Sequence, residues 1–201
     1  MGPHSNCKHM TRNEALTTLN TLIKNPGLIK HHLAAEAVMK SLALYFKNNP
    51  NIKEPIDPAK WALVGLLHDA DYDLTRNNPE KHALLIEQSL SGKIEPEIIY
   101  AIKAHNWENN GVEPKSLMDW SMYCCDELTG LIVASALIHP NKRLSSITAD
   151  FVLNRFNEKT FAKGAQREHI KMCEEKLKIP LMKFIDLALK AMQEISTELG
   201  L

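Results

Sequence analysis

The sequence predicts an all-α protein that folds as one compact helical bundle. Apolar residues recur about every 3.6 positions along nearly every segment, instead of alternating as they do in strands. Residues that cap helices stand before these segments, and prolines or glycines follow them. The 201 residues include no repeat or linker that would divide them, so we expect a single domain over 10–201.

Five helices are expected in the N-terminal half. Thr11 and Glu14 have the spacing of a capping box, which opens the first helix. Asp57 precedes Pro58, an arrangement typical of an N-cap and the first helical position, and it opens the third. The expected ranges, bounded by such caps and by proline or glycine turns, are about 11–24, 28–46, 58–68, 79–91 and 96–105.

Four helices are expected in the C-terminal half, and the first is the longest. Ser116 caps an apolar segment that continues to about Ile138 and is closed by His139 and Pro140. Its length and apolar character make it the best candidate for a central helix. The remaining expected ranges are about 146–156, 165–177 and 180–199.

Residues 1–9 are polar and show no periodicity. We expect them to be a leader before a native start at Met10, or else a natural disordered N-terminus, and we leave them out of the expected core. His4, Cys7 and His9 are thereby excluded as ligand candidates.

Composition narrows the classes of partner. The formal net charge is zero, so no charge excess favours a nucleic acid polymer or an anionic membrane. No apolar run approaches the roughly 20 residues that span a bilayer, and we find no secretory signal. The four cysteines lack C-x-x-C spacing and are too few for a disulfide framework. We therefore expect a cytoplasmic protein, and the sequence leaves its oligomeric state open.

One histidine of the second helix is expected to face the core and its neighbour to face solvent. His31 belongs to an apolar and aromatic stripe within Leu28–Tyr45, with members spaced by three or four positions. His32 instead aligns with Glu36 and Lys40, which predicts a solvated face. His31 is therefore the functional candidate, and a core histidine bonded to a backbone carbonyl is the alternative.

Two further segments place ionisable side chains in apolar surroundings. His68 and Asp69 end the apolar run that begins at Trp61, and Asp126 lies on the apolar stripe of the long helix. A buried imidazole or carboxylate is costly unless it is paired or bound to a metal. Asp126 is expected in mid-helix, so N-terminal capping does not explain it.

Two other histidines are weaker candidates. His105 shares a stripe with Ile102 at the C-terminal end of its helix, where the helix dipole alternatively stabilises a structural histidine. His82 shares a face with Leu85 but lies in a first helical turn, where partial exposure is expected.

Taken together, these side chains predict a metal site inside the bundle. Imidazole nitrogens and carboxylate oxygens on neighbouring helices suit a divalent transition metal, which could be Mn, Fe, Co, Ni or Zn. Cys124 and Cys125 flank Asp126 but lack zinc spacing, so we expect them to be packing residues. The alternative is that the His and Asp side chains pair as imidazolium and carboxylate, which desolvation makes weakly stabilising.

Several stretches resemble the HD-domain superfamily of metal-dependent phosphohydrolases, named for a spaced His, His-Asp and Asp. The stretches are 30–36, 66–72, 101–106, 125–132 and 161–164 with Arg167. Together they resemble one bacterial subgroup of small single-domain HD proteins, over residues 10–201. The resemblance implies an HD-type helical bundle whose metal ligands are His31, His68, Asp69 and Asp126.

The resemblance also implies an activity, the hydrolysis of a nucleotide or another small phosphate ester by a metal-activated water. Members with two metals use additional histidines, and His82 and His105 stand in the corresponding intervals for a second metal or a phosphate contact. Some members have an acidic couple after His-Asp that assists the water. The expected catalytic carboxylates here are Asp69, Asp71 and Asp73.

The sequence also suggests basic side chains that could bind phosphate, and two activities other than hydrolysis. Lys103, Lys163 and Arg167 are candidate phosphate-binding cations, with a solvated surface role as the alternative. Two alternatives to hydrolysis are a di-iron oxygenase of the HD type, which needs the extra histidines engaged, and a non-catalytic regulatory domain that binds a metal and a nucleotide.

Overall fold

The computed structural model describes residues 10–201, and this range is helical with no β-strand. The prediction of a compact all-α bundle is confirmed, while the expected leader at 1–9 lies outside the described residues. The longer helices are α1 (Arg12–Leu22), α2 (Pro26–Lys47), α3 (Pro58–Leu67), α5 (Leu85–Leu90), α6 (Pro96–Ala104), α8 (Leu117–Ile138), α9 (Ala149–Asn157), α10 (Arg167–Lys176) and α11 (Leu181–Glu194). The short elements are α4 (Tyr72–Thr75), η1 (Pro79–Lys81), α7 (Trp107–Asn110), η2 (Leu144–Ser146) and α12 (Ser196–Leu199).

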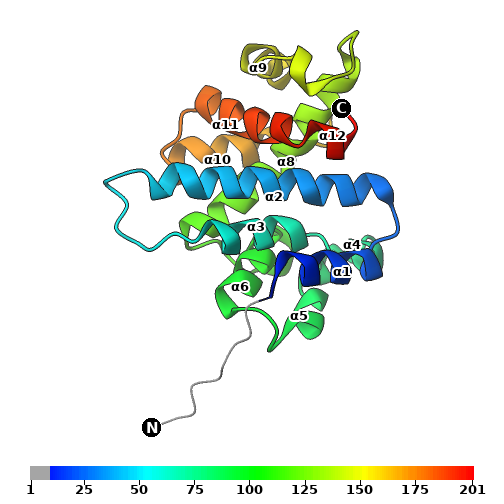
Figure 1. Ribbon diagram of the computed structural model, residues 1–201, viewed down its shortest axis with the longest axis vertical. Coiled ribbons are helices and arrows are strands. Elements are labelled where there is room, and N and C mark those ends of the chain that lie inside the picture. Colours follow the sequence, from blue (N-terminus) through cyan, green and yellow to red (C-terminus); the bar gives the residue numbers. More distant parts are fainter. Residues whose placement is uncertain (1–9) are drawn as a thin grey trace.

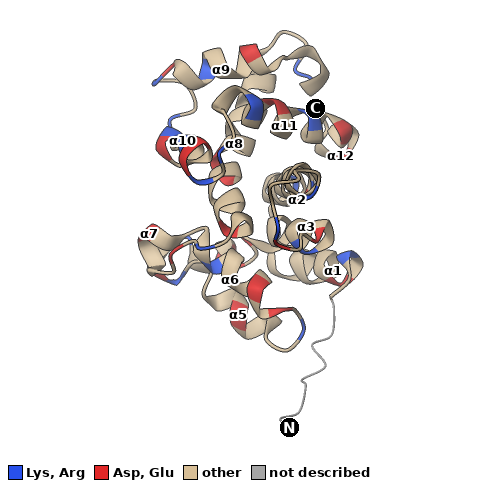
Figure 2. Ribbon diagram, turned by 90° about the vertical axis from the view of Figure 1, so that its left-hand side faces the viewer, with Lys and Arg blue, Asp and Glu red and all other residues tan. Residues whose placement is uncertain are grey.

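Helix α2 runs through the middle of the bundle (Figure 1). Helix α3 packs along one side of α2, and α8 and α11 pack against the other side. Helices α1 and α6 lie against the far side of α3, and α10 packs on α8. The view along α2 shows acidic and basic residues interspersed over the outer helices (Figure 2).

Local cap chemistry explains where the main helices begin. The predicted capping box at the start of α1 is present, and Ser116 forms another with Asp119 at the start of α8. The Asp57 side chain accepts a hydrogen bond from the backbone N–H of Ala59, 2.9 Å away, at the start of α3. Helix α9 begins later than expected, because Thr148 rather than Ser146 caps it.

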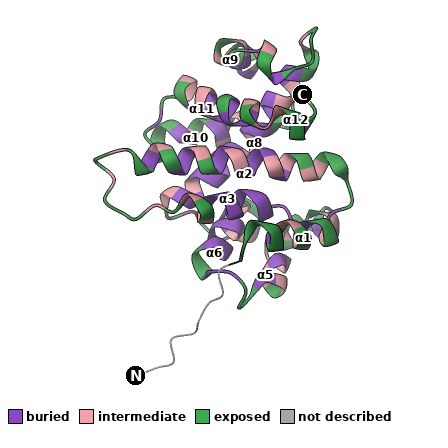
Figure 3. Cartoon of the chain, in the orientation of Figure 1, coloured by how far each residue is buried: buried purple, intermediate pink, exposed green. Residues whose placement is uncertain are grey.

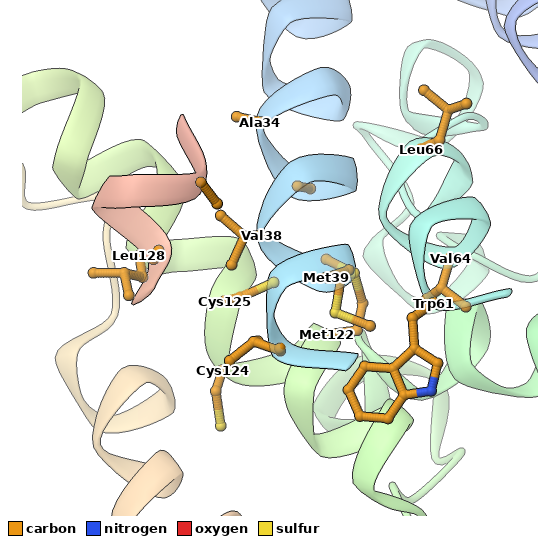
Figure 4. Close-up of a cluster of buried hydrophobic side chains, with 14 of the residues drawn as sticks. Ala34, Val38, Met39, Trp61, Val64, Leu66, Met122, Cys124, Cys125 and Leu128 are labelled. Carbon is orange, nitrogen blue, oxygen red and sulfur yellow. The ribbon is translucent and has the colours of Figure 1, made fainter. Parts of the chain in front are cut away.

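The core lies where α2, α3 and α8 meet (Figure 4). Val38 of α2, Val64 of α3 and Met122 of α8 are fully buried there. Cys124 and Cys125 are fully buried as well, and burial raises the pKa of both thiols well above the ordinary range. A protonated, enclosed thiol behaves as a small apolar group, so the predicted packing role of these cysteines is confirmed.

Packing on two sides corrects the assignment of His32. Because α2 lies between other helices, its buried residues are not confined to one face, and buried, intermediate and exposed residues alternate along it (Figure 3). His32 is fully buried, with no hydrogen-bond partner for either ring nitrogen among the described residues. Glu36 is buried against Arg12, and only Lys40 of the predicted solvated face is exposed. The prediction that His32 faces solvent was wrong because it assumed that the helix has one buried face, marked by a single apolar stripe.

Gly65 allows α3 to approach α2 closely. A Cβ at this position would lie 2.7 Å from the backbone nitrogen of Glu36 and closer still to the carbonyl of Ala35. We expect Gly65→Ala to force the helices apart and to lower the free energy of unfolding by about 2–3 kcal/mol, measured by chemical denaturation. The matched control is Gly130→Ala in α8, where an added Cβ meets no atom within 4 Å. Equal effects of the two substitutions would contradict this account.

The expected helix over 79–91 is interrupted, which corrects the sequence-based boundary. After η1, Ala83 adopts a left-handed conformation with φ 67°, and α5 begins only at Leu85. The carboxylate of Asp71 accepts hydrogen bonds from the backbone N–H groups of Ala83 and Ile86, at 3.0 and 3.1 Å. A side chain distant in sequence thus replaces the helical carbonyl acceptors, and the turn that results presents His82 to α6.

Helix α8 corrects the prediction that no apolar run approaches the length of a bilayer span. It has 22 residues, and an 18-residue window within it has a mean hydropathy of 1.3. By length and composition, this helix could therefore cross a membrane. Of that window, 61% is buried inside the bundle, as in the core helix of a soluble protein.

Candidate metal centre

The four metal ligands expected from the sequence meet at one place, which we call the first cluster. His31 comes from α2, and His68 and Asp69 directly follow α3. The Nε2 atoms of the two histidines are 3.1 Å apart. Asp126 of α8 places its Oδ1 atom 3.0 Å from Nε2 of His31 and 3.4 Å from Nε2 of His68. Asp69 Oδ2 lies 3.7 and 3.6 Å from the same two nitrogens.

The other carboxylate oxygen of Asp69 belongs to a second cluster, with His82 and His105. Asp69 Oδ1 is 2.9 Å from Nε2 of His82 and 3.3 Å from Nε2 of His105. These two Nε2 atoms are 3.1 Å apart. Asp69 therefore joins the clusters, one oxygen in each, and the structure places both weaker histidine candidates beside it.

The outer ring nitrogens show how two of the histidines are oriented. His68 Nδ1 is 2.8 Å from the carbonyl oxygen of Gly65, and His105 Nδ1 hydrogen-bonds the carbonyl oxygen of Ile102. A carbonyl only accepts, so each Nδ1 carries a hydrogen and donates it. In the neutral ring, Nε2 is then the unprotonated nitrogen, with its lone pair directed into the cluster.

The remaining two histidines follow the same rule. His31 Nδ1 lies 3.1 Å from the hydroxyl oxygen of Thr129, whose own hydrogen is donated to the backbone carbonyl of Asp126. His82 Nδ1 lies 2.9 Å from Oδ1 of Asp71. Both Nδ1 atoms therefore donate, and both Nε2 lone pairs face inward.

Four imidazole lone pairs thus converge on carboxylate oxygens that are also acceptors. Such an arrangement is repulsive unless cations or protons lie between the atoms. Ligand atoms about 2.1 Å from one ion and roughly 90–110° apart would be about 3.0–3.4 Å from each other. The separations in both clusters, 2.9–3.7 Å, fall around this range. The donor set, the spacing and the outward Nδ1 contacts all fit divalent metal ions.

The same contacts shift the pKa values of the cluster members. Burial opposes a charge on His31, but the hydrogen bond and charge of Asp126 and the charge of Asp69 raise its pKa to about 9. Burial is likewise outweighed at His82, where Asp69 and Asp71 raise the pKa to about 10. For Asp69 and Asp126, burial favours the neutral acid, but the surrounding histidines hold each pKa well below its usual value.

Asp71 hydrogen-bonds His82, whereas the sequence suggested that it orients or deprotonates a water molecule. Its side chain is 2% exposed, and it accepts hydrogen bonds from His82 and from two backbone N–H groups. We expect Asp71→Asn to weaken metal binding at the second cluster about 10- to 100-fold, because the amide mispairs with the backbone donors and frees His82. Calorimetric metal titration measures this effect. Asp73→Asn is the control, and equal losses in both variants would contradict this role.

Of four other residues expected near the reaction, three have partners away from the clusters. The carboxylate of Asp73 accepts a hydrogen bond from the backbone nitrogen of Lys24. Lys103 pairs with Glu87 at 3.0 Å, and Lys163 is exposed on the loop before α10. The guanidinium of Arg167 donates to the backbone carbonyl of Phe156 in α9 and to those of Phe161, Ala162 and Ala165 in that loop. Arg167 therefore stabilises the loop, and its donors are already engaged.

A cleft of about 160 Å³ opens beside the clusters. Besides Asp69, Asp126, His82 and His105, its lining residues are Tyr72, Asn106, Glu108, Asn109, Tyr123, Glu127, Gln166 and His169. His169 of α10 stacks on the Tyr123 ring at 4.5 Å and lies 3.1 Å from Glu108 of α7. Sequence reasoning did not single out His169, although its spacing of four from the buried Cys173 places both on one helix face.

Glu127 also lines this cleft and was not expected there. It lines a neighbouring depression of about 290 Å³ too, which includes His31 and Asp126. Burial and the adjacent charge of Asp126 raise the pKa of Glu127 to about 7. The two hollows therefore meet at the Asp126–Glu127 pair of α8.

Comparison of the chain with protein-family models, curated proteins and solved structures finds no match.

Proposed function

We propose that this protein is a metal-dependent phosphohydrolase of the HD type, acting on a small phosphate ester. One observation carries the proposal: four histidines donate through Nδ1 to outer partners and turn their Nε2 lone pairs toward Asp69 and Asp126. Each cluster supplies nitrogen and oxygen donors for a divalent transition metal, of which Mn, Fe, Co, Ni and Zn are all compatible.

Some residues of the site would bind the metal ions, and others would orient the residues that bind them. The first cluster would hold one ion through His31, His68, Asp69 and Asp126, and the second would hold another through Asp69, His82 and His105. Bound ions would polarise a phosphoryl oxygen and lower the pKa of water toward neutrality. Asp69 spaces the two clusters, and Asp71 and Thr129 fix the tautomers of His82 and His31.

The test begins with elemental analysis of purified protein. Protein loaded with each metal in turn is then assayed for phosphate release from a panel of phosphate monoesters and nucleotides. The proposal predicts up to two metals per chain and metal-dependent release. Tight binding of phosphate compounds without release would instead favour the non-catalytic regulatory domain, an alternative favoured by the engagement of Asp71 in other contacts.

The second cluster gives specific support to one other function. A di-iron oxygenase needs both additional histidines, and His82 and His105 are both in contact distance of Asp69. Oxygen consumption by the iron-loaded protein with candidate substrates, without phosphate release, would decide for the oxygenase. A single metal per chain would decide against it.

A further inference from the structure

The cleft beside the metal clusters has an unusual charge for a phosphate site, because its lining contains no lysine or arginine among the described residues. The neighbouring depression also lacks them. Of the three candidate phosphate cations, Lys103 and Arg167 are engaged by other partners, and Lys163 is an exposed residue that does not line either hollow. Beyond the clusters, the ionisable lining consists of Glu108, Glu127, His169 and two tyrosines.

This part of the lining is held in place by its own contacts. Tyr123 donates its hydroxyl hydrogen to Oε1 of Glu108 at 3.1 Å, and Oε2 of the same carboxylate is 3.1 Å from Nε2 of His169. Nδ1 of His169 faces Oε1 of Glu127 at 4.0 Å. Helices α7, α8 and α10 are thereby tied together around the cleft, and α7 and α10 lie on the same side of the molecule (Figure 2).

The cleft is also small. Its volume of about 160 Å³ is below the range of about 300–1,000 Å³ that encloses larger organic ligands. Asn106 and Asn109 supply polar amides, although Asn106 already donates to the carbonyls of Pro79 and His82. The available space and polarity suit a few polar atoms, and the Glu108 carboxylate, together with Glu127 where it is ionised, disfavours a second negative charge.

We propose that this cleft holds the non-reacting part of a small phosphate monoester and selects an uncharged or ammonium-bearing group over an anionic one. The inference rests on the proposed function, since the phosphate itself would be held at the metal clusters. It narrows the substrate class from nucleotides in general to monoesters without a further phosphate or carboxylate.

The test compares two phosphate esters of similar size that differ in the charge of the non-phosphate part, the tail. Ethanolamine phosphate has an ammonium tail and phosphoglycolate has a carboxylate tail, while glycerol phosphate, with an uncharged tail, is the reference. Dissociation constants are measured by calorimetry on the metal-loaded protein. We expect ethanolamine phosphate to bind at least about tenfold more tightly than phosphoglycolate, because unlike charges attract and like charges repel across the cleft. Equal binding, or a preference for phosphoglycolate, would overturn the inference.

Substitutions of cleft residues test whether the preference for one tail charge arises in the cleft. Glu108→Gln and Glu127→Gln should each reduce the ratio of the two dissociation constants several-fold, whereas Glu113→Gln, at an exposed position outside the cleft, should leave it unchanged. A ratio unaffected by both cleft variants would also overturn the inference. Inorganic phosphate, which has no tail, separates the two proposals. Its failure to bind metal-loaded protein would overturn both, and its binding without any tail preference would overturn only this one.

Discussion

Replacing Asp69 by alanine is expected to abolish metal binding at both clusters and to reduce phosphate release by on the order of 1,000-fold or more. The reason is that Asp69 contributes Oδ2 to the first cluster and Oδ1 to the second. Its removal leaves the imidazoles of His82 and His105 without the carboxylate they share. Metal per chain is measured by elemental analysis, and activity is measured with the best ester of the substrate panel.

Two comparisons make the Asp69 experiment specific. Asp73→Ala removes the same side chain four positions away, where the carboxylate contacts a backbone nitrogen outside the clusters, and should retain both metals. Asp126→Ala should affect the first cluster far more than the second, because Asp126 contacts only His31 and His68 of the four histidines. Full activity in Asp69→Ala, with both metals still bound, would refute the proposed centre.

Removing the metals is expected to produce the largest loss of stability. An ion that binds only the folded state stabilises it by about 4 kcal/mol at 1,000 times its dissociation constant. For a chain of this size, such a loss corresponds to a fall in Tm of roughly 8–16 °C. Calorimetric melting of the protein with and without a chelator measures the difference. An unchanged Tm would instead support the alternative in which the histidines and aspartates simply pair with one another.

The effect of metal removal should also grow with pH. In the metal-free protein, His31 and His82 have folded pKa values raised to about 9 and about 10, above the ordinary value of 6.5. Each therefore contributes stability that is fully present below pH 6.5 and is lost as the pH rises through 9 to 10. The metal-loaded protein uses neutral imidazoles and should not show this loss. The gap between the two melting temperatures should widen from pH 6.5 to 10, and a constant gap would contradict the assigned contacts.

The second cluster shows the limit of reading helices from periodicity. The 79–91 segment has helical spacing, yet Asp71 draws two backbone N–H groups away from it and Ala83 turns to positive φ. At this break, His82 lies directly before Ala83 and places its Nε2 atom 2.9 Å from Oδ1 of Asp69. No local pattern in 79–91 indicates that Asp71, 12 residues before Ala83 and 15 before Ile86, accepts hydrogen bonds from this segment, so the interruption could not be predicted from the segment itself.

His31 and His32 give the clearest example of what spacing can and cannot decide. Periodicity correctly predicted that His31 faces neighbouring helices, because its ring lies beside Asp126 of α8 and His68 at the end of α3. It misplaced His32, because burial on two sides of α2 depends on how many helices pack around it. Similarly, the positive charge of Arg167 suggested that it binds phosphate, but its guanidinium donates hydrogen bonds to the backbone carbonyls of Ala162 and Phe161.

The amino-acid order alone was enough for the helical class, most helix starts and the donor types of the first cluster, since capping and periodicity act over a few neighbouring residues. The assembly of both clusters around Asp69, the role of Asp71 and the cleft lined by Glu108, Tyr123 and His169 required the packed bundle. These features join residues from separate helices. Their distances follow from how the helices pack against one another, and short-range sequence patterns carry no record of that packing.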